Sequence, residues 1–319
     1  MDNQLNRRQM ITRSGVCLGA GAAAVTTAAV AAGSEKQRGG EPFRYCLNTG
    51  TIMGLKLPLD EEIDVAAKAG YDGIEPWTGK IDKFVVGGGS LRDIKKRLDD
   101  AGLAVESAIG FPRWAVDDKE KRAEGLENMR KAMDAVSQIG GRRIAAPPAG
   151  INRVEGMDLR KVAERYRAVL ELGEKMGVVA QLEIWGSAKA LGTVAEAAFV
   201  AIAANRPDAC LLLDAYHMYK GGSDFDGLKL LNGAAMHCFH INDYPADPPR
   251  ETIGDADRVY PGDGVAPLGT ILRDLYTTGF RGALSLELFN RTYWKQDALT
   301  IAKTGLAKTK AAVKKALRG

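Results

Sequence analysis

Ionisable side chains interrupt five short apolar segments of this sequence, each near the end of a run that otherwise reads as a buried strand. The five runs end in Ile74-Glu75-Pro76-Trp77, Leu182-Glu183-Ile184-Trp185, Leu213-Asp214-Ala215-Tyr216-His217, Phe239-His240-Ile241-Asn242-Asp243 and Leu286-Glu287-Leu288-Phe289. A buried carboxylate or imidazole is costly unless it is paired or bound to a metal. The repeated pattern therefore predicts a site of chemistry and not a structural core.

Alternation along the strands identifies a candidate metal centre. If Glu183 points to one face of its strand, Leu182 and Ile184 point to the other, and both are apolar. The same alternation applies to Asp214, His240 and Glu287. Each of the four could instead pair with an Arg or Lys, but three carboxylates gathered together would repel one another without a cation. An oxygen-rich set with one imidazole suits Mn²⁺ first, with Mg²⁺, Co²⁺ or Zn²⁺ as alternatives.

From residue 43 onward, short apolar segments alternate with longer segments of helical periodicity. Strands are expected at 43–49, 71–76, 103–110, 142–147, 178–185, 209–214, 235–242 and 282–289. Helices are expected at 59–69, 90–101, 117–138, 157–176, 193–205, 224–232, 267–278 and 296–316. Eight β-then-α units predict an α/β chain, a single-domain (β/α)8 TIM barrel over residues 43–319, with its chemistry at the carboxyl ends of the strands. An open doubly wound sheet is the alternative, but no Gly-x-Gly-x-x-Gly turn follows the first strand.

Residues 1–32 resemble a twin-arginine export signal. Arg7 and Arg8 precede a weakly apolar, Ala- and Gly-rich stretch from Val16 to Ala32, and residues 33–42 form a linker. We therefore expect the chain to contact the twin-arginine translocation machinery and to be exported to the periplasm. It would be tethered to the membrane if the leader is retained.

Charge and cysteine usage narrow the partners. The formal net charge of the 319 residues is only +4, and the basic residues are scattered, so no nucleic-acid partner is expected. Cys46, Cys210 and Cys238 stand in apolar strand segments, where a buried hydrophobic role is expected. The sequence is also compatible with a homo-oligomer.

The order of these motifs resembles a known family. Glu183, Asp214-x-x-His217, His240-x-Asn-Asp243 and Glu287 follow one another in the order typical of the sugar isomerase/epimerase family of xylose-isomerase-like barrels. The segment Ala69-Gly70-Tyr71-Asp72-Gly73-Ile74-Glu75 strengthens the resemblance, which covers roughly residues 43–317. It implies that Glu183, Asp214, His240 and Glu287 bind one divalent ion.

The resemblance also implies catalytic roles. His217 is expected beside the substrate oxygens, and the loop from Asp255 to Gly264 supplies Arg258 to the substrate. Glu183 and Glu287 would act as base and acid on opposite faces of the substrate. The chain has three histidines, too few for the trinuclear zinc site of the related DNA-repair enzymes.

Three functions remain open at this point. The first is an isomerase or epimerase of a sugar or cyclitol, acting next to a carbonyl through an enediolate. The second is a lyase that dehydrates inososes or keto-glycosides at the same metal site, and the third is a non-catalytic carbohydrate-binding barrel. Glu75, Trp114 and Trp185 are candidate substrate contacts, although pairing with a Lys or Arg for Glu75, and packing for the two indoles, would also explain them.

Overall fold

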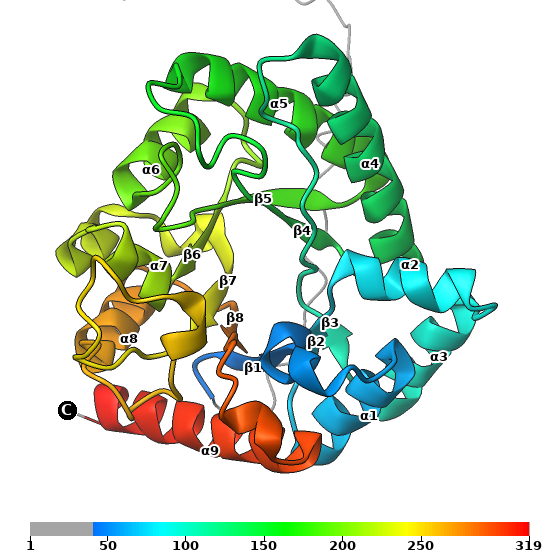
Figure 1. The fold of residues 1–319 in the computed structure, drawn as a ribbon, viewed down its shortest axis with the longest axis vertical. Coiled ribbons are helices and arrows are strands. Elements are labelled where there is room, and N and C mark those ends of the chain that lie inside the picture. The colour runs from blue at the N-terminus through cyan, green and yellow to red at the C-terminus, as the bar shows by residue number, and fades with distance from the viewer. Residues whose placement is uncertain (1–40, 319) are drawn as a thin grey trace, which may run out of the picture. The chain divides into compact units, whose positions relative to one another are not determined.

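Eight parallel strands form one curled sheet, and helices surround it (Figure 1). The structure is a computed structural model that describes residues 41–318. The strands are β1 Arg44–Asn48, β2 Gly73–Glu75, β3 Ala104–Val105, β4 Arg143–Ala146, β5 Val179–Glu183, β6 Leu211–Asp214, β7 Met236–Ile241 and β8 Ala283–Leu286. They lie in the order β3-β2-β1-β8-β7-β6-β5-β4. The backbone N–H of Ala145 donates to the carbonyl oxygen of Ala108 at 2.8 Å, which links β4 to the segment after β3. The predicted barrel is confirmed.

The helices follow the expected alternation with two additions. The α-helices are α1 Leu59–Ala69, α2 Thr78–Val86, α3 Leu91–Ala101, α4 Lys119–Gln138, α5 Leu159–Met176, α6 Val194–Ala203, α7 Ala215–Lys220, α8 Leu268–Thr277 and α9 Ala298–Leu317. The 3-10 helices are η1 Thr49–Leu55, η2 Phe225–Leu230, η3 Gly233–Ala235, η4 Asp255–Asp257 and η5 Tyr293–Lys295. The sequence did not predict α2 or α7, and the helix expected at 224–232 is the shorter 3-10 helix η2.

Helix α1 shows how local sequence sets an element. It buries Leu59, Ile63 and Ala66, which recur at helical spacing and so face one side. Acidic residues occupy its first turn, where they complement the helix dipole. The helix ends at Gly70, whose φ of 90° is a left-handed conformation that glycine adopts without strain.

The alternation predicted for the ligand strands is confirmed. The outward neighbours Leu182, Leu213, Phe239 and Leu286 belong to the apolar core between the sheet and the helices. A separate small apolar layer fills the barrel itself, formed by Cys46, Ile109, Ala145, Leu212, Cys238 and Ala283. All three described cysteines are buried, as expected.

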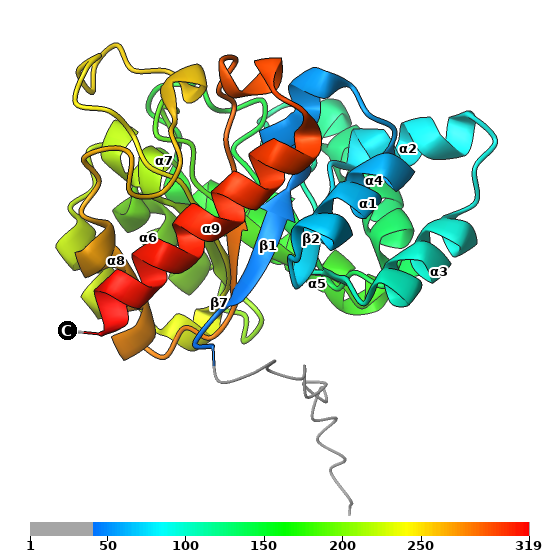
Figure 2. The ribbon, with the colours of Figure 1, turned by 90° about the horizontal axis from the view of Figure 1, so that it is seen from below.

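The loops that follow the strands gather on the side toward which β1 points. Figure 2 shows η1, η5 and the long loop after β7 on this upper side of the barrel. Within residues 41–318, no helix combines the length and the apolar character needed to cross a membrane. The expected export signal (residues 1–32) and most of the linker lie outside the described residues.

Candidate active site

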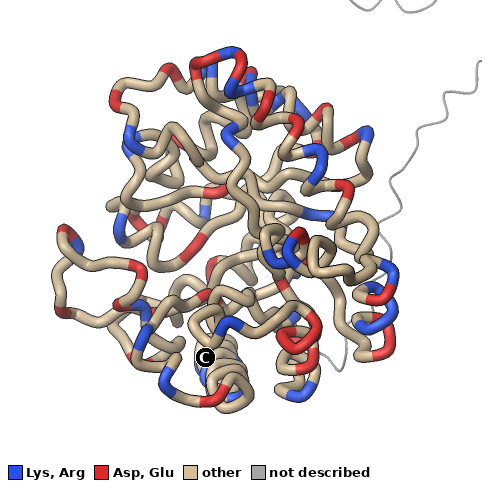
Figure 3. Tube along the Cα trace, turned by 45° about the vertical axis from the view of Figure 1, so that its right-hand side comes forward, with Lys and Arg blue, Asp and Glu red and all other residues tan. Residues whose placement is uncertain are grey.

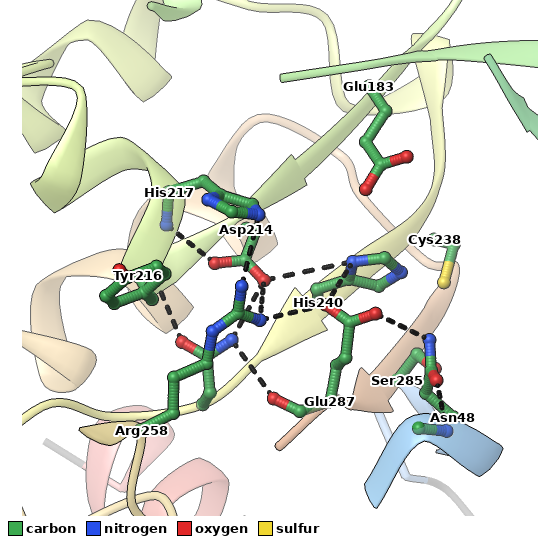
Figure 4. Close-up of polar contacts among 12 residues, drawn as sticks. Asn48, Glu183, Asp214, Tyr216, His217, Cys238, His240, Arg258, Ser285 and Glu287 are labelled. Atoms are coloured by element: carbon green, nitrogen blue, oxygen red, sulfur yellow. Dashed lines mark hydrogen bonds and ion pairs between the residues drawn. The ribbon is translucent and has the colours of Figure 1, made fainter. Parts of the chain in front are cut away.

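Three of the four predicted metal ligands converge at the ends of adjacent strands. Candidate ligand atoms of Asp214, His240 and Glu287 all lie within 4.8 Å of one another, and the three side chains are buried. His240 Nδ1 lies 3.3 Å from Glu287 Oε2 and 3.8 Å from Asp214 Oδ2. Figure 4 shows the three groups facing one another across the barrel axis.

Glu183 belongs to the same site but lies apart from this cluster. Its carboxylate points toward His240 from the end of β5 (Figure 4). Trp185 Nε1 donates to Glu183 Oε1 at 3.1 Å, whereas the buried Oε2 has no hydrogen-bond partner among the described residues. Burial raises the pKa of Glu183 to about 8, against an opposing contribution from His240. Glu183 therefore carries a proton near neutral pH when no cation is present.

Glu75 contacts His240 and is not among the residues that line the cavity, so its expected contact with substrate stays a prediction. Its buried Oε2 accepts hydrogen bonds from Asn48 Nδ2 at 3.0 Å and from Ser285 Oγ at 2.7 Å. The same oxygen lies 3.0 Å from His240 Nε2. Because a carboxylate only accepts, His240 must carry its hydrogen on Nε2, which leaves Nδ1 facing Asp214 and Glu287. No Lys or Arg side chain hydrogen-bonds Glu75 within residues 41–318.

The residues fit a divalent cation. His240 Nδ1 and Glu183 Oε2 are buried and lack hydrogen-bond partners among the described residues, and both face the carboxylate cluster. Burial lowers the pKa of His240, but the charges of Glu287 and Glu75 outweigh burial and place the pKa well above its ordinary value. The site thus favours a positive charge at Nδ1, which a bound cation would supply in place of a proton. Oxygen donors with one imidazole suit Mn²⁺, Mg²⁺, Co²⁺ or Zn²⁺.

Arg258 enters the centre of the site. Its fully buried guanidinium donates from Nη1 to Glu287 Oε2 at 2.8 Å and to Asp214 Oδ2 at 3.1 Å. The guanidinium carbon lies 4.4 Å from the Tyr216 ring centre and 5.1 Å from that of Phe289, so two aromatic faces hold it. Burial alone would raise the pKa of Glu287, but His240 and Arg258 hold that pKa well below its ordinary value.

His217 stands beside Arg258 at the rim of the cavity. The backbone nitrogen of Gly186 lies 3.2 Å from His217 Nδ1, and Nε2 lies 3.1 Å from Arg258 Nη2. Burial, helped by the charge of Arg258, lowers the pKa of His217, so the ring is neutral at neutral pH. Because a guanidinium only donates, Nε2 accepts from Arg258, so His217 helps to hold the Arg258 side chain in the site.

The carboxylate of Asp243 fixes the loop that carries Arg258. Its two oxygens accept backbone N–H groups from Tyr244, Gly262, Gly264 and Ala266, at 2.8 to 3.1 Å. A Cβ on Gly264 would lie 2.4 Å from Asp243 Oδ1, so glycine is needed at this close approach. The loop from Tyr244 to Ala266 is therefore anchored at its base.

A cavity of about 280 Å³ lies above the carboxylate–histidine cluster, and aromatic rings form its walls. Trp77, Phe111, Trp185 and Phe289 line it together with Glu183, His217, Arg258 and Glu287. The prediction that Trp185 lies at the pocket agrees with this placement.

Trp114 belongs to the core, and its expected contact with substrate stays a prediction. It is fully buried and absent from the cavity wall, and its indole N–H donates to the carbonyl oxygen of Pro147 at 2.8 Å. Its ring centre lies 6.0 Å from that of Tyr166 on α5.

Three polar residues of the site were missed. Asn48 Nδ2 bridges Glu75 and Glu287, Asn242 Nδ2 donates to Asp214 Oδ2 at 2.9 Å, and Ser285 holds Glu75. Asn48 ends β1, so the rule that chemistry gathers at strand ends would have found it. Ser285 has a small hydroxyl side chain inside the apolar strand β8, and no sequence pattern distinguishes it from a packing residue.

Outside the site, positive and negative side chains mix around the barrel, as Figure 3 shows along the helices. The fold and the site together define a class: a (β/α)8 barrel with a carboxylate–histidine centre for a divalent metal at the carboxyl ends of its strands. The chain matches the family model described as xylose isomerase-like TIM barrel over residues 63–312, and it belongs to that family.

Individual relatives narrow the class. An inosose isomerase of Bacillus velezensis is 28% identical over 280 residues, which cover 86% of this chain and 98% of the relative. A 3-dehydroshikimate dehydratase of Pseudomonas aeruginosa is 26% identical over 249 residues, covering 75% of this chain and 37% of the relative. A crystal structure titled as the IOLI protein with a binding zinc atom superposes with a TM-score of 0.79 at 25% identity, covering 87% of this chain and all of that one. With these isomerase relatives and epimerases among the others, the chain is an enzyme of the isomerase or epimerase type.

Proposed function

We propose that this enzyme isomerises or epimerises an unphosphorylated sugar or cyclitol by moving a proton on a carbon next to a carbonyl, through an enediolate. The observation that carries the proposal is a pair of buried carboxylates that line one cavity: Glu183 at the end of β5 and Glu287 directly after β8. A cavity of about 280 Å³ lies near the lower end of small-molecule pockets, about 300–1,000 Å³. Its size suits one sugar or cyclitol ring.

The pKa values of the two carboxylates are shifted in opposite directions, which is typical of an acid and base pair. In the metal-free site burial raises the pKa of Glu183 to about 8, so the surroundings of this group favour its protonated form and suit it to a role as acid. The neighbouring His240 and Arg258 outweigh burial at Glu287 and keep this group ionised, so that it can accept a proton. A substrate held between them would lose a proton from carbon to Glu287. Glu183 would deliver a proton to the substrate.

The remaining side chains would hold and polarise the substrate oxygens. His217 and Arg258 line the same cavity, and the Arg258 guanidinium offers N–H donors beside the carboxylates. Asp214, His240, Glu183 and Glu287 would hold the divalent ion, with Mn²⁺ our first expectation and Mg²⁺, Co²⁺ or Zn²⁺ the alternatives. When bound, such an ion stabilises negative charge on the substrate oxygens as the proton leaves.

Dehydration at the same site is the second candidate. It is favoured by the match to the 3-dehydroshikimate dehydratase and by the raised pKa of Glu183 in the metal-free site, which suits a group that delivers a proton to a departing hydroxyl. An inosose or a keto-glycoside is the substrate class that this reaction would take here.

We also propose that the enzyme is exported to the periplasm by the twin-arginine pathway. The proposal depends on Arg7 and Arg8 ahead of a weakly apolar stretch. The Arg7→Lys/Arg8→Lys double variant should stay in the cytoplasm, whereas the parent chain should appear in the periplasmic fraction. Equal export of both would refute the proposal.

A solvent-exchange experiment tests the catalytic proposal. Metal-loaded protein is incubated in D2O with ketohexoses, inososes and 3-keto-glycosides, and the products are followed by NMR, with Glu287→Gln as the control. Deuterium that enters a substrate carbon without loss of water supports isomerisation or epimerisation, and loss of water supports the lyase. No deuterium entry and no water loss with any of these substrates would overturn both.

A further inference from the structure

A second, larger hollow lies beside the active-site cavity, between α2 and α4. These helices are neighbours around the barrel (Figure 1). The hollow has a volume of about 640 Å³, and we call it the outer groove, with Ile81, Asp82, Phe111, Asn128, Lys131 and Ala135 among its walls. Phe111 lines both the outer groove and the active-site cavity. The two spaces therefore share one wall residue.

The outer groove has an apolar floor and a polar rim. Its floor includes the buried Ile81 and Ala132, and its rim includes the exposed Asp82 and Asn128. Within residues 41–318 the side chains of Asp82 and Asn128 make no hydrogen bond or ion pair, so their polar atoms are available to a ligand. A concave apolar surface with a few polar groups at its edge is typical of small-molecule sites.

Phe111 is placed to carry a ligand from one space to the other. Its ring centre lies 5.1 Å from that of Trp77 and 5.9 Å from that of Trp185, both of which wall the active-site cavity. Phe111 nevertheless remains 46% exposed. An exposed ring in a continuous aromatic wall offers a flat surface on which another ring can pack.

We propose that the outer groove binds the substituent of a glycoside whose keto sugar ring occupies the active-site cavity. This inference rests on the proposed function and names its substrate class more closely. The substituent would be a ring with an apolar face, either a second sugar or an aryl group, packed on Phe111 and over the floor near Ile81. Asp82 and Asn128 would hydrogen-bond its hydroxyl groups. A ligand that spans both spaces would pass over Phe111, which lines both of them.

Binding to the metal-loaded full chain tests the inference without requiring turnover. The probes are the methyl 3-keto-glycosides, phenyl 3-keto-glycosides and 3-keto-disaccharides of glucose, galactose and mannose, titrated by calorimetry. We expect the phenyl glycoside or the disaccharide of at least one sugar to bind about tenfold more tightly than its methyl glycoside, a factor worth about 1.4 kcal/mol. Tighter binding of the phenyl compound would indicate an aryl substituent, and tighter binding of the disaccharide would indicate a second sugar.

Two substitutions on α4 make a matched pair. Asn128→Trp places a large side chain in the outer groove, whereas Ala123→Trp places the same side chain on an exposed position of the same helix outside it. The gain in affinity should disappear in Asn128→Trp and persist in Ala123→Trp. Deuterium exchange on an unsubstituted ketose, which tests the proposed function separately, should be unchanged in both.

Several results would overturn the inference. These are equal binding of methyl and larger glycosides, no binding of any probe, or a gain that survives in Asn128→Trp. A dimer of the parent chain that Asn128→Trp abolishes and Ala123→Trp keeps would assign the outer groove to a protein interface instead. If the enzyme still exchanges deuterium into an unsubstituted ketose, any of these results would contradict the inference about the outer groove but not the proposed function.

Discussion

Glu75→Gln should weaken metal binding although Glu75 is not a proposed ligand. Glu75 Oε2 accepts from Asn48 and Ser285 and holds the Nε2–H of His240 at 3.0 Å. The amide oxygen of glutamine can keep these three bonds, with its NH2 group directed to the position that faces Cys238 Sγ at 4.0 Å. The substitution therefore removes the negative charge behind His240 while it conserves shape.

The expected size of the effect follows from the role of such partners. A carboxylate behind a metal-bound histidine fixes its orientation and makes the free nitrogen a stronger donor, and its loss costs about 10- to 100-fold in metal affinity. This corresponds to about 1.4–2.8 kcal/mol. Ser285→Ala removes one bond of Glu75 and keeps the charge, so its effect should stay below about tenfold.

The assay is a titration of metal-free protein with Mn²⁺ in competition with a chelator, for the parent, Glu75→Gln and Ser285→Ala. Thermal unfolding of the metal-free proteins serves as the control for folding. A Glu75→Gln dissociation constant within twofold of the parent value would refute the reasoning, because His240 would then not depend on the charge behind it.

Four further predictions concern the site and its supports. Glu183→Gln and Glu287→Gln should each lower deuterium exchange by at least about 100-fold in an NMR assay, and near-parent exchange in either would contradict the assignment of acid and base. Asp243→Asn replaces an acceptor oxygen that holds backbone N–H groups, so amide protons of Gly262 and Gly264 should exchange with solvent faster by hydrogen-exchange mass spectrometry; unchanged protection would count against the anchor. Because the pKa of Glu183 is raised to about 8 in the folded chain, its contribution to the stability of the metal-free protein is full below its ordinary pKa and is lost as pH rises toward 8, by up to about 1.4 kcal/mol per pH unit. Urea unfolding should show that Glu183→Gln removes this loss, and identical pH profiles would contradict it. Trp114→Phe removes the indole N–H that the carbonyl oxygen of Pro147 accepts, so the melting temperature should fall while KM stays unchanged. A raised KM would indicate that Trp114 contributes to the substrate site.

The sequence predicted the barrel because its signals are periodic and local. Apolar neighbours such as Leu213 and Phe239 must face the helices, and this alternation alone placed Asp214 and His240 inside. Helix α1 carries amphipathic spacing and a terminal glycine, and its predicted bounds are those observed. Helix α7 was missed because it starts at the ligand strand itself, with Asp214 as its N-cap.

Roles that depend on contacts across the barrel were beyond the sequence. Glu75 looked equivalent to the ligands because it ends an apolar strand, but its partners Asn48 and Ser285 come from strands far away in the chain. Trp114 follows a strand as Trp185 does, yet its loop turns it into the core against α5. Spacing gives the direction of a side chain along one strand, whereas its partner depends on the packing of several elements.

The most direct test of the metal centre is its stoichiometry in the purified protein. Elemental analysis after loading and desalting should find one divalent ion per parent chain, and His240→Gln should retain far less than one. A parent chain that holds no ion, or a His240→Gln chain that holds a full equivalent, would contradict the account of this site.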